Sequence, residues 1–474
     1  MKKRVLSMIC MMLALLQVVL LTGCNNNGGY YESVIEIIEE EPDNSSDSSE
    51  DQSSQTSQTV SSNNTSSTQG TNAKTWQQVV KEMPSSLRGK TVQYFTTYPK
   101  NEIPGVEKAI SAFEKASGVQ VKWTVVGYTS YDTELNARMA AGNIPDVAFT
   151  QGLVVSRFQH FQPISNLNFD FSDKAWDQQT MKDFTIKGKV YATHLSPEYT
   201  YMHQPQAMFY NKDLIKKYDL EDPYKLWESG KWTFNKMMEM AKIYNEETGN
   251  LGFSFFGPYE YPIMKGLCAG PFGFDGNTVT NTFKETNLNS VMQEMATWKQ
   301  NGLLSTQMLD EGSFIENKML FYTFNFGTAR YTNSHCLKMK QNGTFGIVPL
   351  PAIDGQKTYY QIMGEYEGYC IPKGAKNAEI VPYFLRSVFD KSNYDVNKFF
   401  CSKEALKVYD WSMKQTRVMQ TYLFCGQTQT RNNVEVMGEK IWGASSSAVS
   451  TEIAKGRDTL DMEIASLNKI LKNF

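Results

Sequence analysis

The sequence predicts an α/β protein whose first domain is built on a parallel sheet. Strand-like patterns alternate with amphipathic helical patterns between residues 91 and 149, in the order strand, helix, strand, helix, strand. This order produces a parallel sheet with helices on both of its faces. The chain has 474 residues, a length that predicts two to three domains, so further structure is expected beyond this sheet.

The first strand and helix follow from periodicity. Residues 91–97 (TVQYFTT) are rich in β-branched and aromatic side chains, which favours a strand. The helix expected over 104–118 places Val106, Ile110 and Phe113 on one face. Proline at its start and glycine at its end are typical helix boundaries.

The next three elements complete the unit. Alternating apolar residues predict a strand over 119–125, and Leu135 and Met139 share one face of a helix expected over 131–141. A short apolar strand follows at 147–149. Ligands of such sheets bind beyond the carboxyl ends of the strands. That rule nominates the residues that follow the first and third strands: Thr97, Tyr98, Thr150 and Gln151.

The N-terminus has the pattern of an export signal. Lys2, Lys3 and Arg4 precede an uncharged apolar stretch, Val5–Leu21, and Leu21-Thr22-Gly23-Cys24 follows. This arrangement matches a bacterial lipobox, which predicts removal of residues 1–23 and a lipid on Cys24. The alternative is an uncleaved membrane helix, for which 17 apolar residues are a marginal length.

A polar tether follows the lipidated cysteine. Of the 30 residues in 44–73, 25 are Ser, Thr, Asn, Gln or Gly, and 25–73 contain nine acidic residues and no Lys or Arg. Such a segment buries too little apolar surface to offset the entropy of ordering. We therefore expect 24–86 to be a disordered tether.

Charge and motifs exclude several functions. Residues 76–474 have a net charge of +2, which argues against a nucleic-acid binder. The sequence contains no GxSxG, HExxH, P-loop or GxGxxG signature, so no enzyme activity, cofactor or metal is expected. The four histidines lack metal-ligand spacing and the cysteines of the body form no CxxC pair.

Several segments resemble family 1 extracellular solute-binding proteins, the maltose-binding-protein-like lipoproteins of ABC importers. The main one is 204–214 (QPQAMFYNKDL), with its Phe-Tyr-Asn-Lys-Asp core. Other similar segments occur in the same order as in the family, at 109–121, 140–147, 227–233, 314–319 and 367–377. The resemblance covers 87–474 and is weakest after residue 400.

The resemblance implies a two-lobed, type II periplasmic-binding-protein fold whose chain crosses between lobes three times. The crossings are expected near 203–208, 322–326 and 365–371. Lobe one is then 87–203 with 325–366, and lobe two is 204–324 with 367–474. Apolar residues at helical spacing in 453–471 predict a core-packing helix at the C-terminus.

The resemblance also implies a function. The protein would capture a carbohydrate, as an oligosaccharide, by hinge closure and deliver it to the permease subunits of an ABC transporter. It would be a monomer, anchored by lipid to the outer face of the bacterial cytoplasmic membrane, with no nucleic-acid partner. Sugars need aromatic platforms for their C–H faces and fixed polar groups for their hydroxyls.

Candidate ligand contacts follow from these two requirements. The resemblance places Gln204 at a ligand-contact position where an acid is common, with His203 beside it. Phe324 or Phe326 is the expected platform. The full set of expected contacts is Thr97, Tyr98, Thr150, Gln151, His203, Gln204, Tyr259, Tyr261, Asn325, Phe326, Glu365 and Trp442.

Three alternatives remain open at the level of sequence. The same scaffold could bind a solute that is not a sugar. A surface glycan-active enzyme would use Glu260, Glu365 or Glu367 as its carboxyl groups. A glycan adhesin would use the binding site without a transporter.

Overall fold

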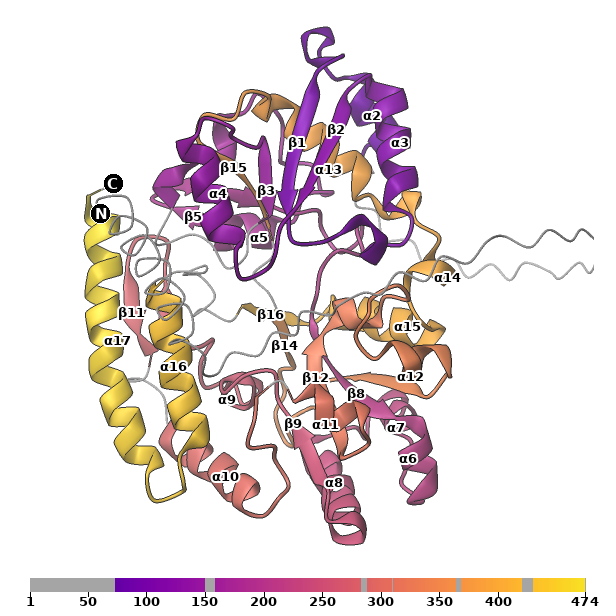
Figure 1. Ribbon diagram of the computed structural model, residues 1–474, viewed down its shortest axis with the longest axis vertical. Coiled ribbons are helices and arrows are strands. Elements are labelled where there is room, and N and C mark those ends of the chain that lie inside the picture. The colour runs from indigo at the N-terminus through magenta and orange to yellow at the C-terminus, as the bar shows by residue number, and fades with distance from the viewer. Residues whose placement is uncertain are drawn as a thin grey trace, which may run out of the picture. The chain divides into compact units, whose positions relative to one another are not determined.

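The computed structural model describes residues 73–149, 158–282, 288–308, 310–363, 368–419 and 429–473. All of them belong to one compact unit of the chain. Its strands form two main sheets and three two-stranded pairs (Figure 1). Cys24, Thr150, Gln151 and Glu365 lie outside the described residues.

The first sheet has strand order β2-β1-β3-β15-β4, with β7 paired to β15. β1 pairs in parallel with β2 and β3, whereas β15 is antiparallel to β3, β4 and β7. The strands are β1 (Thr91–Thr96), β2 (Gln120–Val125), β3 (Val147–Phe149), β4 (Phe161–Gln162), β7 (Ala192–Thr193) and β15 (Tyr369–Pro372). The expected parallel unit at 91–149 is confirmed.

Helices cover both faces of the first sheet because successive side chains of β1 point to opposite sides. Tyr94 packs in one core cluster with Phe113, and Phe95 packs in the other with Tyr131 and Leu135. α3 starts after Gly105 and ends at Gly118, and both glycines have left-handed φ values, 90° and 73°. The helices are α2 (Trp76–Lys81), α3 (Val106–Ser117), α4 (Tyr131–Ala140), α5 (Gln178–Asp183) and α13 (Val381–Val388). The expectation of a disordered tether over 24–86 is wrong for its last part, because Trp76, Val79 and Val80 form an apolar face by which α2 packs on α3 and α13.

The second sheet has strand order β13-β8-β12-β9. β8 is a central strand, with β12 and β13 paired antiparallel to it on either side. Every residue of β8 is buried. β9 lies parallel to β12. The strands are β8 (Gln206–Asn211), β9 (Leu251–Ser254), β12 (Met319–Asn325) and β13 (Phe345–Pro349).

Helices on the second-sheet side include a C-terminal group in which α10, α16 and α17 pack on one another (Figure 1). α17 buries Ile453, Leu460, Ile464, Leu467 and Leu471, as its spacing predicts. The helices are α6 (Lys212–Lys217), α7 (Pro223–Glu228), α8 (Phe234–Thr248), α9 (Glu260–Met264), α10 (Leu288–Gln300), α11 (Glu311–Ile315), α12 (Leu337–Gln341), α14 (Val396–Phe399), α15 (Lys403–Ser412), α16 (Gln429–Gly443) and α17 (Val449–Lys472).

The small strand pairs stand outside both sheets. β14 pairs in parallel with β16, and Met363 of β14 bridges Pro205, which directly precedes β8. The pairs are β5 (Thr185–Ile186) with β6 (Lys189–Val190), β10 (Phe272–Phe274) with β11 (Val279–Asn281), and β14 (Tyr360–Met363) with β16 (Thr416–Met419).

The strand pairing differs from the expected assignment of segments to lobes. β12 pairs with β8 along Phe321–Asn325, so the chain does not cross between lobes near 322–326. β13 belongs to the second sheet and β15 to the first, the reverse of what we expected for 325–366 and the start of 367–474. Both are short, wholly buried strands, and such runs carry no periodicity that identifies their sheet.

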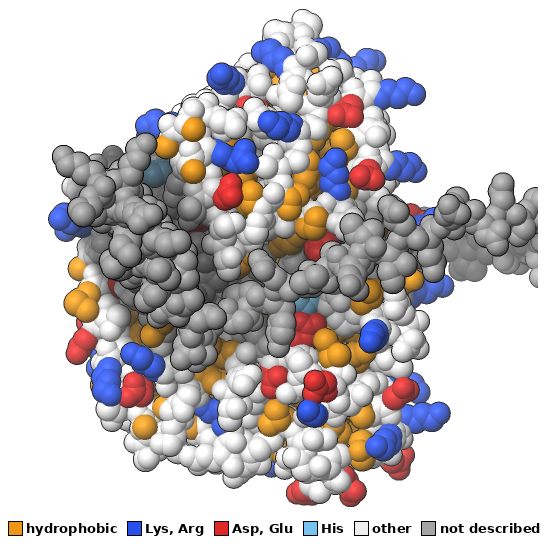
Figure 2. Space-filling model, in the orientation of Figure 1, with side chains coloured by type: hydrophobic (Ala, Val, Ile, Leu, Met, Phe, Trp, Pro, Cys, Tyr) orange, Lys and Arg blue, Asp and Glu red, His pale blue; other side chains and the backbone are white. Residues whose placement is uncertain are grey.

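The described residues show three passages between the two sheets. The chain passes from β7 to β8, from β13 to β15, and from α13, which packs on α2 and α3, to α15, which packs on β13. Among these residues no helix is both long and apolar enough to cross a membrane. Figure 2 shows positive and negative side chains interspersed on the face in view.

Candidate functional site

Gln204 lies where the carboxyl end of β1 in the first sheet approaches the carboxyl end of β12 in the second, whose last residue Asn325 pairs with Gln206. Tyr98 follows β1 of the first sheet, and Gln204 lies two residues before β8 of the second. The Gln204 side chain is 2% exposed, and its Nε2 donates a hydrogen bond of 2.8 Å to the Tyr98 hydroxyl. This bond joins a loop of the first sheet to a segment that passes between the sheets, as the rule for parallel sheets leads one to expect.

Gly327 makes room for the Gln204 amide. A Cβ at position 327 would overlap Gln204 Oε1 and lie 2.9 Å from Asn325 Oδ1. Asn325 Oδ1 accepts a hydrogen bond of 3.1 Å from the Gly327 amide, which turns the chain at the end of β12. The Phe326 amide donates to the carbonyl of Pro205 at 2.9 Å, so this turn is fastened to the same passage.

Two further buried amides lie beside this point, and the sequence analysis did not include them. Gln206 and Gln361 have no exposed surface, and Gln361 Nε2 donates to the carbonyl of Gln206 at 2.9 Å. Both side-chain polar atoms of Gln206 lack a partner among the described residues. In a strand with one solvated face, the alternation of apolar and polar residues shows which side chains point away from the core. Every residue of β8 is buried, so this alternation could not single out Gln206.

Two aromatic rings mark the carboxyl edge of the second sheet. Phe256 follows β9 and Phe324 is near the end of β12, and these two strands are parallel. Both rings are half-buried, and they lie edge to face with centroids 5.4 Å apart. The His335 ring lies 5.2 Å from Phe324, and its Nδ1 is 2.6 Å from Glu311 Oε2. Such a pair offers the apolar surface that a sugar face needs.

A buried ionic cluster joins β16 to the first-sheet side. Arg417 of β16 donates two hydrogen bonds to Asp177, the N-cap of α5, at 2.5 and 2.8 Å. His203 Nε2 lies 3.9 Å from Asp177 Oδ2. Burial alone would raise the pKa of Asp177, but the hydrogen bonds from Arg417 and the charges of its neighbours hold it well below its ordinary value.

Two stacked histidines complete this cluster. The rings of His194 and His203 lie 4.0 Å apart, and each places a nitrogen within 2.9 Å of the Leu195 carbonyl. Burial lowers the pKa of His194 to about 4 and, together with His194, lowers that of His203 well below its ordinary value. Both rings are therefore neutral at neutral pH, and each carries its proton on the nitrogen that faces the carbonyl.

The structure gathers some of the expected contacts and not others. Thr97 and Tyr98 are partly exposed after β1, and Gln204 and Asn325 surround Gly327. His203 is beside them in sequence, but its ring is buried in the ionic cluster. The polar contacts thus converge around the Tyr98–Gln204 hydrogen bond.

Four of the expected aromatic contacts are buried among other side chains. Phe326 packs between Phe400 and Tyr409, although Asn325 beside it caps the turn. Tyr261 stacks on Phe234, Tyr259 is 1% exposed, and the Trp442 indole donates to the Thr306 carbonyl at 3.1 Å. Tyr259 and Tyr261 are buried at the start of α9. Conversely, Phe256 and Phe324 are the rings that stay partly accessible.

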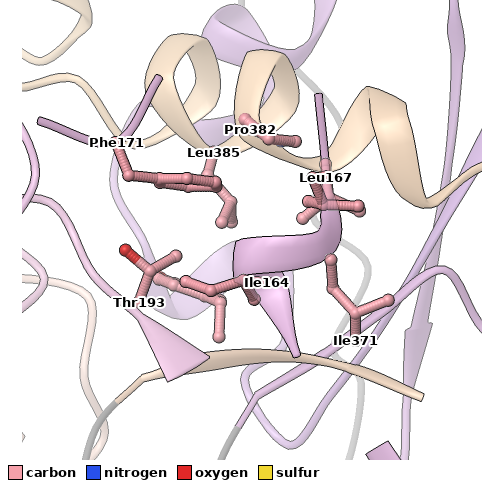
Figure 3. Close-up of a pocket in the computed structure, with 9 residues that line it drawn as sticks. Ile164, Leu167, Phe171, Thr193, Ile371, Pro382 and Leu385 are labelled. Atoms are coloured by element: carbon pink, nitrogen blue, oxygen red, sulfur yellow. The ribbon is translucent and has the colours of Figure 1, made fainter. Parts of the chain in front are cut away.

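A small apolar gap in the first-sheet domain has a different character. It lies among Ile164, Leu167, Phe171, Ile371 and residues of α13 (Figure 3). The space among these side chains has no room for a water molecule. This gap is a packing defect between α13 and the sheet rather than a ligand site.

A family model identifies the family of the chain. The model for bacterial extracellular solute-binding proteins matches residues 108–395, more than half of the chain. Searches of curated protein sequences gave no match.

Solved structures with the same fold include sugar-binding receptors. The GacH receptor of Streptomyces glaucescens, studied with acarbose, is 18% identical with a TM-score of 0.57, covering 81% of this chain and 99% of that one. MalE of Listeria monocytogenes, in complex with maltose, is 17% identical with a TM-score of 0.56, covering 80% and 98%. The sugar-binding protein MalE of Xanthomonas citri is 14% identical with a TM-score of 0.58, covering 81% and 100%. The fold class is thus the two-lobed one expected.

Proposed function

Because the chain belongs to the bacterial extracellular solute-binding proteins, we propose that it captures a carbohydrate, as an oligosaccharide, for an ABC importer. The observation that carries this proposal is the Tyr98–Gln204 hydrogen bond, which lies at the carboxyl ends of β1 and β12. A polar pair that spans two domains supplies hydroxyl-binding groups where domain closure excludes water. The half-buried pair Phe256 and Phe324 supplies the apolar platform.

An uncharged ligand agrees with the charge of the body. Residues 76–474 have a net charge of +2, and the polar groups at the site are two amides and a phenol. The solved relatives in the comparison were studied with acarbose and maltose, which are oligosaccharides. We therefore place carbohydrates ahead of anionic and cationic solutes.

Calorimetry of the full chain against a panel of mono-, di- and oligosaccharides tests this function. We expect binding to at least one oligosaccharide and no product formation. Binding of peptides or polyamines, with no heat from any sugar, would show that the protein binds a solute other than a sugar. Turnover of a glycan would show that the protein is an enzyme.

Replacing Gln204 by alanine is the sharpest single test of the site. Gln204→Ala leaves the Tyr98 hydroxyl and the ligand without their shared partner, so we expect binding to weaken by about 1–3 kcal/mol. Lys217→Ala, on the surface of α6, is the matched control and should bind as the wild type does. Unchanged affinity of Gln204→Ala would remove this residue from the ligand site.

We also propose that the protein is a monomer attached to the outer face of the cytoplasmic membrane through Cys24. The lipobox and the polar tether in the sequence support this attachment. The wild type should incorporate a labelled fatty acid and the Cys24→Ser variant should not, because the variant has no lipid-accepting thiol. A wild type that incorporates no label would favour an uncleaved helix over a lipid.

A further inference from the structure

Glu260 is a fully buried carboxyl group at the start of α9. Its Oε2 accepts hydrogen bonds from the Phe256 amide at 3.0 Å and from the Thr323 hydroxyl at 2.7 Å. The Phe256 amide also lies 2.7 Å from Thr323 Oγ1. The three groups therefore form a closed triangle, while Glu260 Oε1 has no partner in the part of the chain that the structure describes.

The triangle of Glu260, Thr323 and the Phe256 amide holds the backbone of the loop that follows β9. Phe256 lies two residues beyond the last residue of this strand, and its amide has no ladder partner there, so Glu260 and Thr323 satisfy it instead. Thr323 belongs to β12, one residue before Phe324. The triangle thus fixes the backbone of Phe256 relative to the strand that carries the other ring of the platform.

We propose that Glu260, together with Thr323, is a positioning residue that holds Phe256 edge-on against Phe324 and so forms the apolar platform for the ligand. This inference rests on the proposed function. The observed edge-to-face geometry, with centroids 5.4 Å apart, is the arrangement to be maintained. Aromatic pairs prefer this geometry, but the loop has no strand pairing of its own to impose it.

The electrostatics of Glu260 agree with a positioning role. Burial raises the pKa of this carboxyl to about 8, against which the hydrogen bonds from Thr323 and Phe256 act only in part. The group is therefore an uncharged acid at neutral pH. An uncharged acid accepts hydrogen bonds through one carbonyl oxygen, and a glutamine amide of the same length does the same.

This equivalence gives a test with a conservative and a disruptive variant. Glu260→Gln keeps the acceptor, Glu260→Leu removes it, and Glu239→Gln on the exposed face of α8 is the control. Hydrogen–deuterium exchange at the Phe256 amide measures positioning without any ligand. Calorimetry with the best sugar of the panel measures its consequence.

We expect Glu260→Leu to accelerate exchange at Phe256 and to weaken sugar binding by about tenfold, the scale of one lost aromatic contact. Glu260→Gln and Glu239→Gln should stay within about twofold of the wild type in both measurements, since neither loses the acceptor. Wild-type protection and affinity in Glu260→Leu would overturn the proposal. Failure of Glu260→Gln to rescue would also overturn it.

Two further variants keep the test decisive. If Glu260→Leu does not fold, Thr323→Val removes the other corner of the triangle and should give the same two effects. Phe256→Ala removes one ring of the platform and should weaken sugar binding. Its own amide at position 256 should exchange as slowly as in the wild type, because Glu260 and Thr323 still accept from it. If the wild type binds no sugar, the proposed function fails, and exchange at Phe256 alone then decides whether Glu260 positions this residue.

Discussion

Replacing Arg417 by methionine is expected to lower the free energy of unfolding by about 3–5 kcal/mol, the cost of leaving a buried charge without its partner. Asp177 is buried, and Arg417 provides two of the hydrogen bonds that keep it ionised. Methionine occupies a similar volume and removes only the charge and the donors. Chemical denaturation monitored by tryptophan fluorescence measures the difference.

A surface ion pair supplies the control for this prediction. Lys407 and Glu228 pair where their side chains are 60% and 39% exposed, so Lys407→Met should change stability by less than about 1 kcal/mol. The double variant Arg417→Met with Asp177→Asn should recover most of the loss, because it leaves no unpaired charge and keeps an oxygen to cap α5. A loss below 1 kcal/mol in the single variant would show that water reaches Asp177.

The Asp177–Arg417 pair also ties β16 to the domain of the first sheet. β16 pairs with β14, and β14 bridges the residue before β8, so this pair anchors segments that pass between the sheets. We expect Arg417→Met to alter the equilibrium between open and closed lobes as well as stability. A change in ligand affinity beyond that explained by the unfolded fraction would demonstrate this effect.

The first sheet could be predicted because its signals are local. Val106, Ile110 and Phe113 form one face of α3, glycines bound the helix, and the strands on either side alternate. Each of these features depends on residues less than about two helical turns apart. The C-terminal helix α17 was predictable for the same reason.

Lobe membership could not be predicted because it depends on distant pairing. β13 and β15 are both apolar throughout, and nothing within Phe345–Pro349 or Tyr369–Pro372 distinguishes the two sheets. The pairing partners lie more than 100 residues away in the sequence, at β8 and β3. Hydrophobic runs of this kind satisfy either sheet equally well.

The candidate site was predictable where a backbone rule applied. Strand ends identified Tyr98, and the resemblance identified Gln204, which the structure brings into contact. Side-chain exposure was not predictable: Phe326 and Phe324 differ by two positions, yet only Phe324 is half-exposed. The turn at Gly327, imposed by the space that Gln204 fills, moves Phe326 into the core.

Protonation of His194 should destabilise the folded protein in acid. Its pKa is about 4 when folded and 6.5 when unfolded, so the unfolded state binds the extra proton between these values and stability falls as pH falls. A shift of this size corresponds to about 3 kcal/mol at roughly 1.4 kcal/mol per pKa unit. The loss should begin below about pH 6.5 and level off below about pH 4.

Other groups change stability in the opposite direction over the same range, so the His194 contribution has to be isolated. Burial raises the pKa of Asp183 to about 6 and that of Glu260 to about 8, and both therefore favour folding as the pH falls. The groups that face His194 are the charged Asp177 and Arg417 and the titratable ring of His203. Comparing the wild type with His194→Asn, whose amide retains the donor toward the Leu195 carbonyl, cancels the contributions of Asp183 and Glu260.

The difference between the two proteins should change with pH, whatever its value at pH 7. His194→Asn removes ring packing against His203 and Tyr369, which makes it less stable by an amount independent of pH. Between pH 7 and pH 4, however, it should gain about 3 kcal/mol relative to the wild type, because it has no proton to bind on unfolding. Urea denaturation of both proteins at half-unit pH intervals measures this difference. A constant difference across the range would mean that His194 titrates alike in the folded and unfolded chain, which a ring without exposed surface does only if water enters the cluster.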